Sequence, residues 1–429
     1  MFPVVGGGAR DGVEELRLCP GIDVVASPRA ATVLLVAGWL PAALRPAAAQ
    51  VHDQLPHPRA TVCWARGDLA AAAETFPAAT VVPPDGDVVA VLKRVHRGLV
   101  TGERDSEASL LPHEPPSPWK GVGPHGQGGE GMMGGRPYGR PMPMTGPDRD
   151  GLALDRLPLR VGPFFPALPA GLVLDVVLQG DVVQEASIAA NAFADAAAAA
   201  ERAAVAPGFG DDPFRRALRE PVGVPLLELA RAGHHLRWAA ATLRLHGLRA
   251  AALRTLSLAV GLTSDALPRL AALRRRLERD PTLRWATRGV GRVSAAQLPA
   301  GLGGPVARAA GVVRDARLDD PAYADLGFRP VTHDGADAWA RFRQRLGEAE
   351  QSLRLAQAAQ SGAPASVARD RVESPQGELS TASAPSGLLL GLVGDLLAGM
   401  EWGDAVATIA SLDFDLEAQP AAQVGVTLR

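Results

Sequence analysis

The two cysteines are the side chains of this chain best suited to hold iron or another soft metal. Cys19 and Cys63 lie far apart in the sequence, and no Cys-x-x-Cys pair occurs. A tetranuclear iron–sulfur cluster takes four ligands, usually thiolates. Cys63 stands inside the apolar run Ala60–Trp64, which predicts a strand, and in such a place a thiol packs as a small hydrophobic group. We therefore expect no iron–sulfur cluster on this chain alone.

A second set of soft ligands lies in a glycine-rich segment in the middle of the chain. It consists of Met132, Met133, Met142 and Met144, with His125 a few residues before them. Thioethers and imidazoles together are suited to Cu(I), whereas methionine-rich loops also make adaptable contact surfaces. The density of Gly and Pro around them is typical of a linker. We interpret the segment as an interdomain linker, with a metal-binding loop as the alternative.

Neighbouring histidines are the remaining metal candidates. His234 and His235 are adjacent on a predicted helix, so their side chains project about 100° apart and do not suit one ion. His235 and His246 share a helix face, but about three turns of helix separate them. Polar contacts at an interface between helices or subunits are therefore the simpler role for these residues.

The composition restricts the class of protein. A net charge of −2 over 429 residues gives no overall attraction to nucleic acid and allows two or three domains. The longest apolar stretches, 31–44 and 387–400, reach only about 14 residues, whereas spanning a bilayer takes roughly 20. The first residues also lack the pattern of a signal peptide. We expect a cytoplasmic protein without a membrane span of its own.

The elements that would position these groups fall into three stretches, residues 1–102, 103–150 and 151–429. In the first stretch, apolar strand-like runs at Ala31–Ala37, Ala60–Trp64 and Ala79–Val82 alternate with helical patterns. This alternation predicts a small α/β domain with a doubly wound, flavodoxin-like sheet. The second stretch is the Gly/Pro/Met-rich linker.

The third stretch predicts an α+β domain that is mainly helical with a small antiparallel sheet. Strands are expected at Leu157–Pro163 and Leu172–Leu178, with a hairpin turn at Gln179-Gly180-Asp181. Helical spacing of apolar residues predicts the following helices: Ile188–Val205, Pro225–Leu245, Leu248–Leu258, Ala266–Asp280, Ala338–Leu355 and Gly387–Leu412.

Two segments of this third stretch carry a family resemblance. Residues 303–323 begin Gly-Gly-Pro-Val-Ala-Arg-Ala-Ala-Gly, and residues 372–379 run Val-Glu-Ser-Pro-Gln-Gly-Glu-Leu. This succession resembles the hydrogenase-large-subunit-like protein of respiratory complex I and of membrane-bound [NiFe] hydrogenases. The resemblance implies that 372–379 is a buried hairpin near the active cavity. Glu373 and Glu378 are then cavity candidates, either in proton movement or in a purely structural hairpin.

The same resemblance implies two possible cofactors, a [NiFe] centre and quinone, and the sequence can be compared with what each requires. A [NiFe] centre in these relatives needs two Cys-x-x-Cys pairs, and this chain has none. Complex I relatives use the vacated cavity for quinone and carry a histidine in a Gly-Pro turn, whereas the turn Gly162–Gly171 has no histidine. We expect no cofactor: neither a NiFe centre nor bound quinone.

The first stretch resembles the partner subunit of that family. Ala26-Ser27-Pro28-Arg29 precedes the first long apolar run, and Gln54-Leu55-Pro56-His57-Pro58-Arg59 follows the next helix. This is similar to the iron–sulfur small subunit of complex I and hydrogenases, over about 80 residues and without its cluster cysteines. The chain as a whole therefore resembles a fusion of the small and large subunits with degenerate redox motifs.

The resemblance and the missing ligands together predict a function. We expect a non-catalytic peripheral subunit of a complex-I-like complex, structural or regulatory in ion- or proton-coupled transport. Its partners would be antiporter-like membrane subunits that hold it on the inner face of the cell membrane, with no nucleic acid. One alternative is a working NADH-quinone oxidoreductase or hydrogenase-type electron-transfer subunit that binds quinone. Others are a copper-binding scaffold, or a methionine-rich loop that plugs the vacated cavity.

Overall fold

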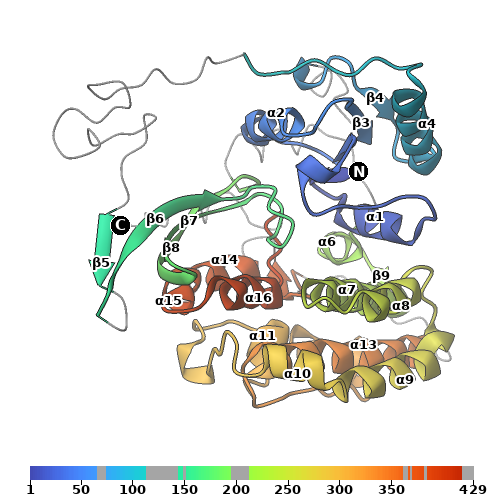
Figure 1. The fold of residues 1–429 in the computed structure, drawn as a ribbon. Coiled ribbons are helices and arrows are strands. Elements are labelled where there is room, and N and C mark those ends of the chain that lie inside the picture. Colours follow the sequence, from blue (N-terminus) through green and yellow to red (C-terminus); the bar gives the residue numbers. More distant parts are fainter. Residues whose placement is uncertain are drawn as a thin grey trace.

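Two parts of unequal size lie against each other in this protein (Figure 1). The computed structural model describes residues 1–64, 74–112, 144–147, 151–194, 212–360, 366–367, 370–380 and 384–417. His125, Met132, Met133 and Met142 lie outside these ranges. The expected mixture of α and β structure, with a mainly helical C-terminal region and small sheets, is confirmed. Among the described helices, none combines the length and the apolar character that crossing a bilayer requires.

The N-terminal part is built on a four-stranded parallel sheet. Its strands are β1 (Phe2–Val5), β2 (Val33–Ala37), β3 (Ala60–Trp64) and β4 (Thr80–Val82), paired in the order β1-β2-β3-β4. Every residue of β2 and β3 is buried, as expected for apolar strands that are covered on both faces. The order follows the sequence, without the reversal of a flavodoxin-like sheet among the described strands. That finer expectation is therefore not confirmed.

Helices cover both faces of this sheet. α1 (Arg10–Glu15) and α4 (Val88–Thr101) pack on one face, and α2 (Arg45–Asp53) packs on the other. Asp87 begins α4 by accepting a hydrogen bond from the backbone N–H of Ala90 at 2.9 Å. Gly102 ends α4 with φ of 75°, a left-handed conformation that favours glycine.

The chain then returns to the sheet, within the stretch predicted as a linker. Glu107 is buried and accepts hydrogen bonds from the backbone N–H of Thr61 at 2.8 Å and from its hydroxyl at 2.7 Å. Arg104 donates to the same carboxylate at 3.0 Å. Arg59 is also buried and donates to the hydroxyl of Ser109 at 3.0 Å. Residues 103–112 therefore contact the N-terminal end of β3, an inner strand of the sheet.

A second sheet opens the larger part. Its strands are β5 (Met144–Pro147), β6 (Ala153–Val161), β7 (Leu172–Gln179) and β8 (Val182–Asn191), an antiparallel meander in that order. The hairpin predicted at Gly180 joins β7 to β8. Ile188 pairs with Leu174 inside β8, so the helix predicted to begin at Ile188 is wrong over 188–191, where pairing with β7 prolongs the strand.

Helices and short turns make up the rest. The described helices are α6 (Pro213–Ala217), α7 (Val224–Leu245), α8 (Arg249–Ala259), α9 (Leu267–Glu278), α10 (Pro281–Thr287), α11 (Gly304–Ala309), α12 (Pro321–Ala324), α13 (Ala338–Gln360), α14 (Pro385–Leu390), α15 (Val393–Leu397) and α16 (Trp402–Leu412). The 3₁₀ turns are Leu16–Leu18, Pro28–Ala30, Ala42–Leu44, Ser264–Ala266, Ala295–Gln297 and Ala316–Asp319. Two short antiparallel pairs join β9 (Val222–Gly223) to β10 (Ser366–Val367) and β11 (Arg371–Ser374) to β12 (Gly377–Ser380).

Helices α7 and α13 form the centre of this part. Their facing apolar residues, among them Leu236, Ala239, Phe342 and Leu346, are fully buried. Alanine at such positions lets the two helix axes approach closely. The single helix predicted over 387–412 is wrong, because α14, α15 and α16 divide this segment. Gly399, with φ of 82°, lies in the turn between α15 and α16.

Candidate functional site

The hairpin β11–β12 is the centre of a buried group of charged side chains. In its register Glu373 lies opposite Glu378, but the two carboxylates differ in surroundings. Glu373 is 2% exposed, whereas the side chain of Glu378 is 22% exposed and has Arg314 at 3.5 Å. Of the two predicted carboxylates, only Glu373 belongs to the buried group.

Glycines bring the two family-like segments together. Gly304, at the start of α11, has φ of 81°, and a Cβ there would lie 2.1 Å from the carbonyl oxygen of Gln376. A Cβ on Gly377 would lie 3.1 Å from the Cα of Gly304. A side chain at Gly304 would therefore force the hairpin away from α11. This close approach explains why glycine is needed in both segments.

Arg308 of α11 joins three carboxylates in the interior. Its side chain donates to both oxygens of Glu348 on α13, at 2.8 and 3.0 Å, which is a bidentate pair. Its Nη1 donates to Glu373 at 2.7 Å and lies 2.9 Å from Asp315. All four side chains are at most 1% exposed. Arg308 therefore holds α11, α13 and the hairpin together.

A second cluster surrounds Glu228 of α7. Arg317 lies 3.3 Å from this carboxylate and forms a bidentate pair with Asp315 at 2.9 and 2.8 Å. Ser352 of α13 donates to Glu228 at 2.6 Å. Arg231, one turn further along α7, donates to the backbone oxygens of Glu373 at 2.6 Å and Ser374 at 2.9 Å. Since Asp315 contacts both Arg308 and Arg317, the two clusters are continuous.

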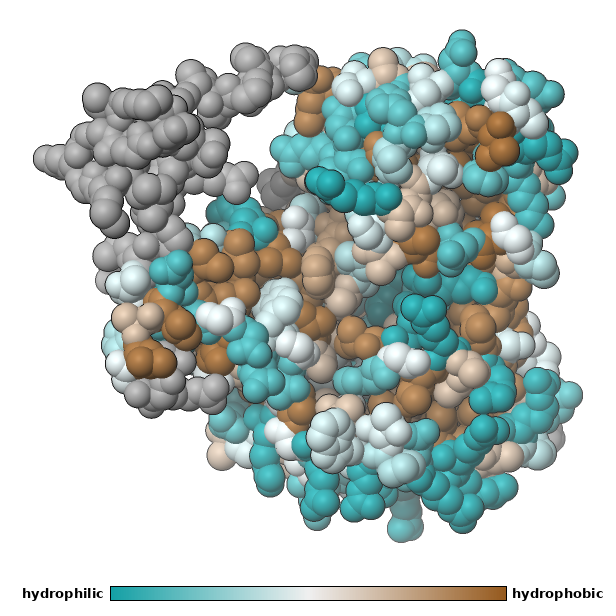
Figure 2. Space-filling model, viewed as in Figure 1, coloured by the Kyte–Doolittle hydropathy of each residue, from teal (hydrophilic) through white to brown (hydrophobic). Residues whose placement is uncertain are grey.

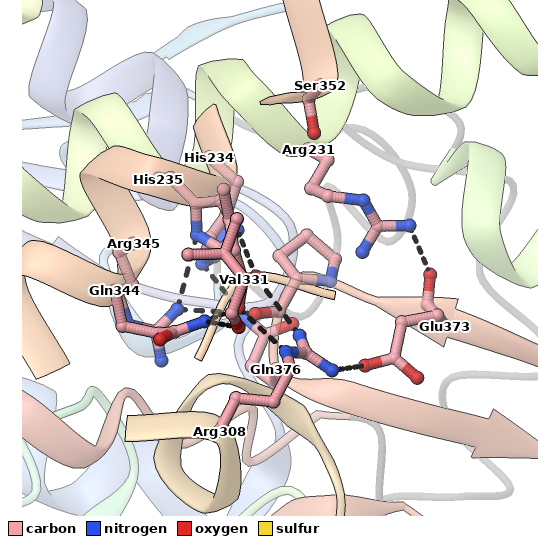
Figure 3. Close-up of polar contacts among 12 residues, drawn as sticks. Arg231, His234, His235, Arg308, Val331, Gln344, Arg345, Ser352, Glu373 and Gln376 are labelled. Atoms are coloured by element: carbon pink, nitrogen blue, oxygen red, sulfur yellow. Dashed lines mark hydrogen bonds and ion pairs between the residues drawn. The ribbon is translucent and has the colours of Figure 1, made fainter. Parts of the chain in front are cut away.

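The network continues from Glu348 toward the C-terminal turn. His235 Nε2 lies 3.3 Å from Glu348, too poorly aligned for a hydrogen bond. Its Nδ1 faces Arg345 Nη1 at 3.3 Å. Arg345 in turn lies 3.1 Å from Asp413, which also contacts His234 at 2.7 Å. Figure 3 shows how the side chains from α7 and α13 converge on the hairpin residues.

Burial and charge pull the pKa values of these groups in different directions. Burial alone would raise the pKa of Glu348, but the charge of Arg308 and its hydrogen bonds lower it well below its ordinary value. For Glu373, burial and the nearby Asp315 raise the pKa, and they outweigh Arg308. Burial lowers the pKa of His235 to about 3. His235 is therefore neutral, so its Nδ1 accepts from Arg345.

The network reaches the N-terminal part through Asp413. Arg10 of α1 donates to this carboxylate at 3.1 Å. Three further ion pairs join α1 to α7: Arg237 to Glu15 at 2.7 Å and to Asp11 at 3.4 Å, and Arg244 to Glu14 at 2.7 Å. Figure 1 accordingly shows α1 between the N-terminal sheet and the helices α7 and α8. The two parts of the molecule thus meet through charged groups.

The predicted sulfur ligands lie elsewhere. Cys63 is 1% exposed in the middle of β3, where burial raises the pKa of its thiol to about 12. Cys19 is half-buried, and its thiol faces the carbonyl oxygen of Glu15 at 3.9 Å. Cys63 packs as a small side chain within the apolar cluster on one face of the N-terminal sheet. Met144 begins the edge strand β5, paired with Arg156.

The space beside the hairpin is small. A cavity lined by Arg317, Tyr323, Arg371 and Glu373 has a volume of about 10 Å³. A single water needs roughly 10–15 Å³ of this kind of volume. A quinone head group does not fit this cavity.

The predicted turn at 162–171 lies between β6 and β7, and Gly162 approaches the carbonyl oxygen of Leu172 so closely that a Cβ would lie 2.0 Å from it.

Most of the network was not found from the sequence. His235 and Glu373 were candidates, whereas Glu228, Arg308, Arg345, Glu348 and Asp413 were not. A usable signal was present in α13, where Arg341, Arg345, Glu348 and Ser352 recur at spacings of three or four residues. Such a stripe normally marks a solvated face, but in this helix it is buried.

Part of this chain is similar in sequence to known proteins. Residues 226–383 match the family described as respiratory-chain NADH dehydrogenase, 49 Kd subunit. The D 1 subunit of the NADH-quinone oxidoreductase of Streptomyces coelicolor is 39% identical over 113 residues, covering 24% of this chain and 30% of that protein. The D 1 subunit of the same enzyme from Chloroherpeton thalassium is 37% identical over 91 residues, covering 20% and 21%.

A solved structure is also similar in part. One chain of the membrane-bound sulfane sulfur reductase, an archaeal respiratory membrane complex, aligns with a TM-score of 0.41 and 19% identity over 62% of this chain and 98% of that chain. The chain matches between about a fifth and three tenths of the length of the curated relatives named here. The predicted large-subunit-like part is confirmed over 226–383. This stretch holds the buried network except Asp413, and it is similar to the 49 Kd subunit of respiratory-chain NADH dehydrogenase.

Proposed function

We propose that this protein is a non-catalytic, peripheral subunit of a complex-I-like membrane complex. The observation that carries the proposal is the interior around the hairpin, which paired charges fill. Arg231, Arg308 and Arg345 are each at most 1% exposed, and each bonds to the hairpin through its backbone oxygens or through Glu373. This packing of paired charges against the hairpin favours a fixed scaffold.

The chemistry of the sulfur groups supports the same role. The sequence holds two cysteines and no Cys-x-x-Cys pair, while iron–sulfur and [NiFe] centres depend on several thiolates. The N-terminal part would correspond to the iron–sulfur small subunit of such complexes, with its parallel sheet retained and no ligand set. Its ion pairs with α7 would then replace a contact between two separate subunits.

Antiporter-like membrane subunits are the partners that we propose, with the protein on the inner face of the membrane. Affinity purification of the tagged full chain from membranes in mild detergent tests this directly. We expect proteins with many membrane spans to co-purify in stoichiometric amounts. Recovery of the chain alone, from membranes prepared without salt extraction, contradicts the proposal.

The homology to NADH-quinone oxidoreductase favours one alternative, a redox-active subunit that binds quinone. Iron and acid-labile sulfide assays on the purified complex separate the two functions. We expect neither element to be bound by this chain. An electron paramagnetic resonance signal of the reduced complex that disappears in Cys63→Ser would establish the alternative and end the non-catalytic proposal.

A further inference from the structure

Helices α9 and α10 present an unusually basic surface. Seven arginines of residues 267–292 are exposed: Arg269, Arg275, Arg276, Arg279, Arg284, Arg288 and Arg292. Arg269 and Arg276 on α9, and Arg279 directly after it, recur at spacings of seven and three residues, which places them on one side of this segment. We call these seven arginines, with Trp285, the basic face. Figure 2 shows hydrophilic residues along the lower edge of the molecule, where Figure 1 places α9 and α10.

The basic face is not neutralised from within. Residues 267–292 contain eight arginines and only two carboxylates, whereas the whole chain has a net charge of −2. Glu278 is bound by Arg274 at 2.9 Å, and Asp280 caps α10 by accepting from the backbone N–H of Leu283 at 3.0 Å. None of the seven exposed arginines has an ion-pair partner in the part of the chain that the structure describes. Their charge is therefore available to an external anion.

A large aromatic side chain lies among these charges. Trp285 is 85% exposed, although its neighbours Leu283 and Thr287 on α10 are buried. The helix thus keeps a packed side and a side that carries Trp285 with Arg284 and Arg288. An indole that stands in water among arginines is the arrangement found where proteins meet the headgroup layer of a bilayer.

We propose that the basic face binds the anionic phospholipid headgroups of a membrane directly. Arginines supply the attraction to a negatively charged surface, and Trp285 enters the headgroup layer. Single-stranded nucleic acid stacks successive bases on several aromatic side chains, whereas Trp285 is the sole aromatic residue of 267–292. The charge distribution and the single indole favour lipid. This contact goes beyond the proposed function, in which other subunits hold the protein at the membrane.

Vesicle co-sedimentation of the purified full chain tests the proposal. The vesicles contain either phosphatidylcholine alone or phosphatidylcholine mixed with phosphatidylglycerol. We expect binding to the anionic vesicles only, weakened by high salt because exposed charges are screened. Replacing Arg275 and Arg276 together by Glu should weaken binding by about thirty-fold or more, given the contribution of each arginine near an anionic surface. Trp285→Ala should weaken it several-fold.

Matched variants keep the test decisive. The double change Arg94→Glu and Arg97→Glu alters two exposed arginines on α4, at the opposite end of the molecule in Figure 1, and should leave binding unchanged. The variant with Arg275→Lys and Arg276→Lys keeps both positive charges and should bind anionic vesicles as the wild type does. It therefore separates the loss of charge from misfolding of the Glu variant. Equal loss in the α4 variant, equal binding to neutral vesicles, or tighter binding to an RNA oligonucleotide than to anionic vesicles would each overturn the proposal. Since no other subunit is present, these results are independent of the proposed function.

Discussion

The N-terminal sheet and the interior around the β11–β12 hairpin bury different kinds of side chain: apolar ones in the sheet and charged ones around the hairpin. Strands β2 and β3 are apolar along nearly their whole length, and even Cys63 packs there as a protonated, hydrophobic side chain. Around the hairpin, by contrast, Arg308 and Glu348 are buried as an ion pair. Apolar packing tolerates small changes, but a buried charge is stable only while its partner remains. The two regions should therefore respond very differently to single substitutions.

Removal of Arg308 should have the largest effect. Arg308→Ala leaves three carboxylates buried without their shared cation, so the free energy of unfolding should fall by about 4 kcal/mol or more. Urea unfolding followed by circular dichroism measures this loss. Arg314→Ala is the matched control, because the Arg314 side chain is 46% exposed and its ion pair with Glu378 is loose. This control should lie within about 0.5 kcal/mol of the wild type, and an equal loss in both variants would remove the contrast.

Two of the three carboxylates bound by Arg308, Glu348 and Glu373, should not be equivalent. Glu348 has a lowered pKa, so its charged form stabilises the fold above the unfolded pKa, and this stability disappears as pH falls. The pKa of Glu373 is raised, so its charged form costs stability at neutral pH. Glu348→Gln should therefore cost about 3 kcal/mol at neutral pH, and Glu373→Gln clearly less. Chemical denaturation of both variants checks this order, and the reverse order would contradict the pairing described.

A buried carboxylate beside the first residues of β3 should give an intermediate effect. Burial raises the pKa of Glu107, but hydrogen bonds from His52, Thr61 and Arg104 lower it to about 2, from 4.5. Its contribution to stability is complete above the unfolded value and is lost as pH falls from about 4.5 toward 2. Glu107→Gln should cost about 2 kcal/mol at neutral pH. The difference from the wild type should shrink in urea titrations at lower pH, and a constant difference would argue against this pairing.

Cys63 should give the smallest effect of the four. Cys63→Ala removes one buried sulfur from an apolar setting, so we expect a loss of about 1 kcal/mol. The native thiol should also resist alkylation at pH 8, because it is buried and burial raises its pKa to about 12. Mass spectrometry after brief iodoacetamide treatment should find Cys19 modified before Cys63. Rapid labelling of Cys63 would show that solvent and reagent reach its thiol, and would contradict its burial in β3.

The sequence predicted best what depends on neighbouring residues. The strand Ala60–Trp64 and the helix α7 follow from continuous apolar or helical patterns, and their observed bounds agree closely with the predicted ones. Helix α13 begins at the predicted Ala338 but continues past the predicted Leu355 to Gln360. The Gly-Gly-Pro segment and the hairpin also pointed to the correct family region. Ile188 was misassigned because its alanine-rich surroundings favour helix, while pairing with Leu174 in β7 makes it a strand residue.

Contacts between distant elements could not be predicted in this way. Arg308 meets Glu348 and Glu373 only because α11, α13 and the hairpin converge, and nothing local to Arg308 indicates this. Asp413 likewise gains its partners from α1, α7 and α13. The polar stripe of α13 would have been informative only after this face of the helix was known to be buried.

The return of residues 103–112 to the sheet has a practical consequence for dividing the protein. A cut after Gly102, at the end of α4, would remove Glu107 and Ser109 and leave Thr61 and Arg59 without the groups they bind. Anyone who wishes to excise the N-terminal part as a minimal folding unit should therefore keep the chain through residue 112.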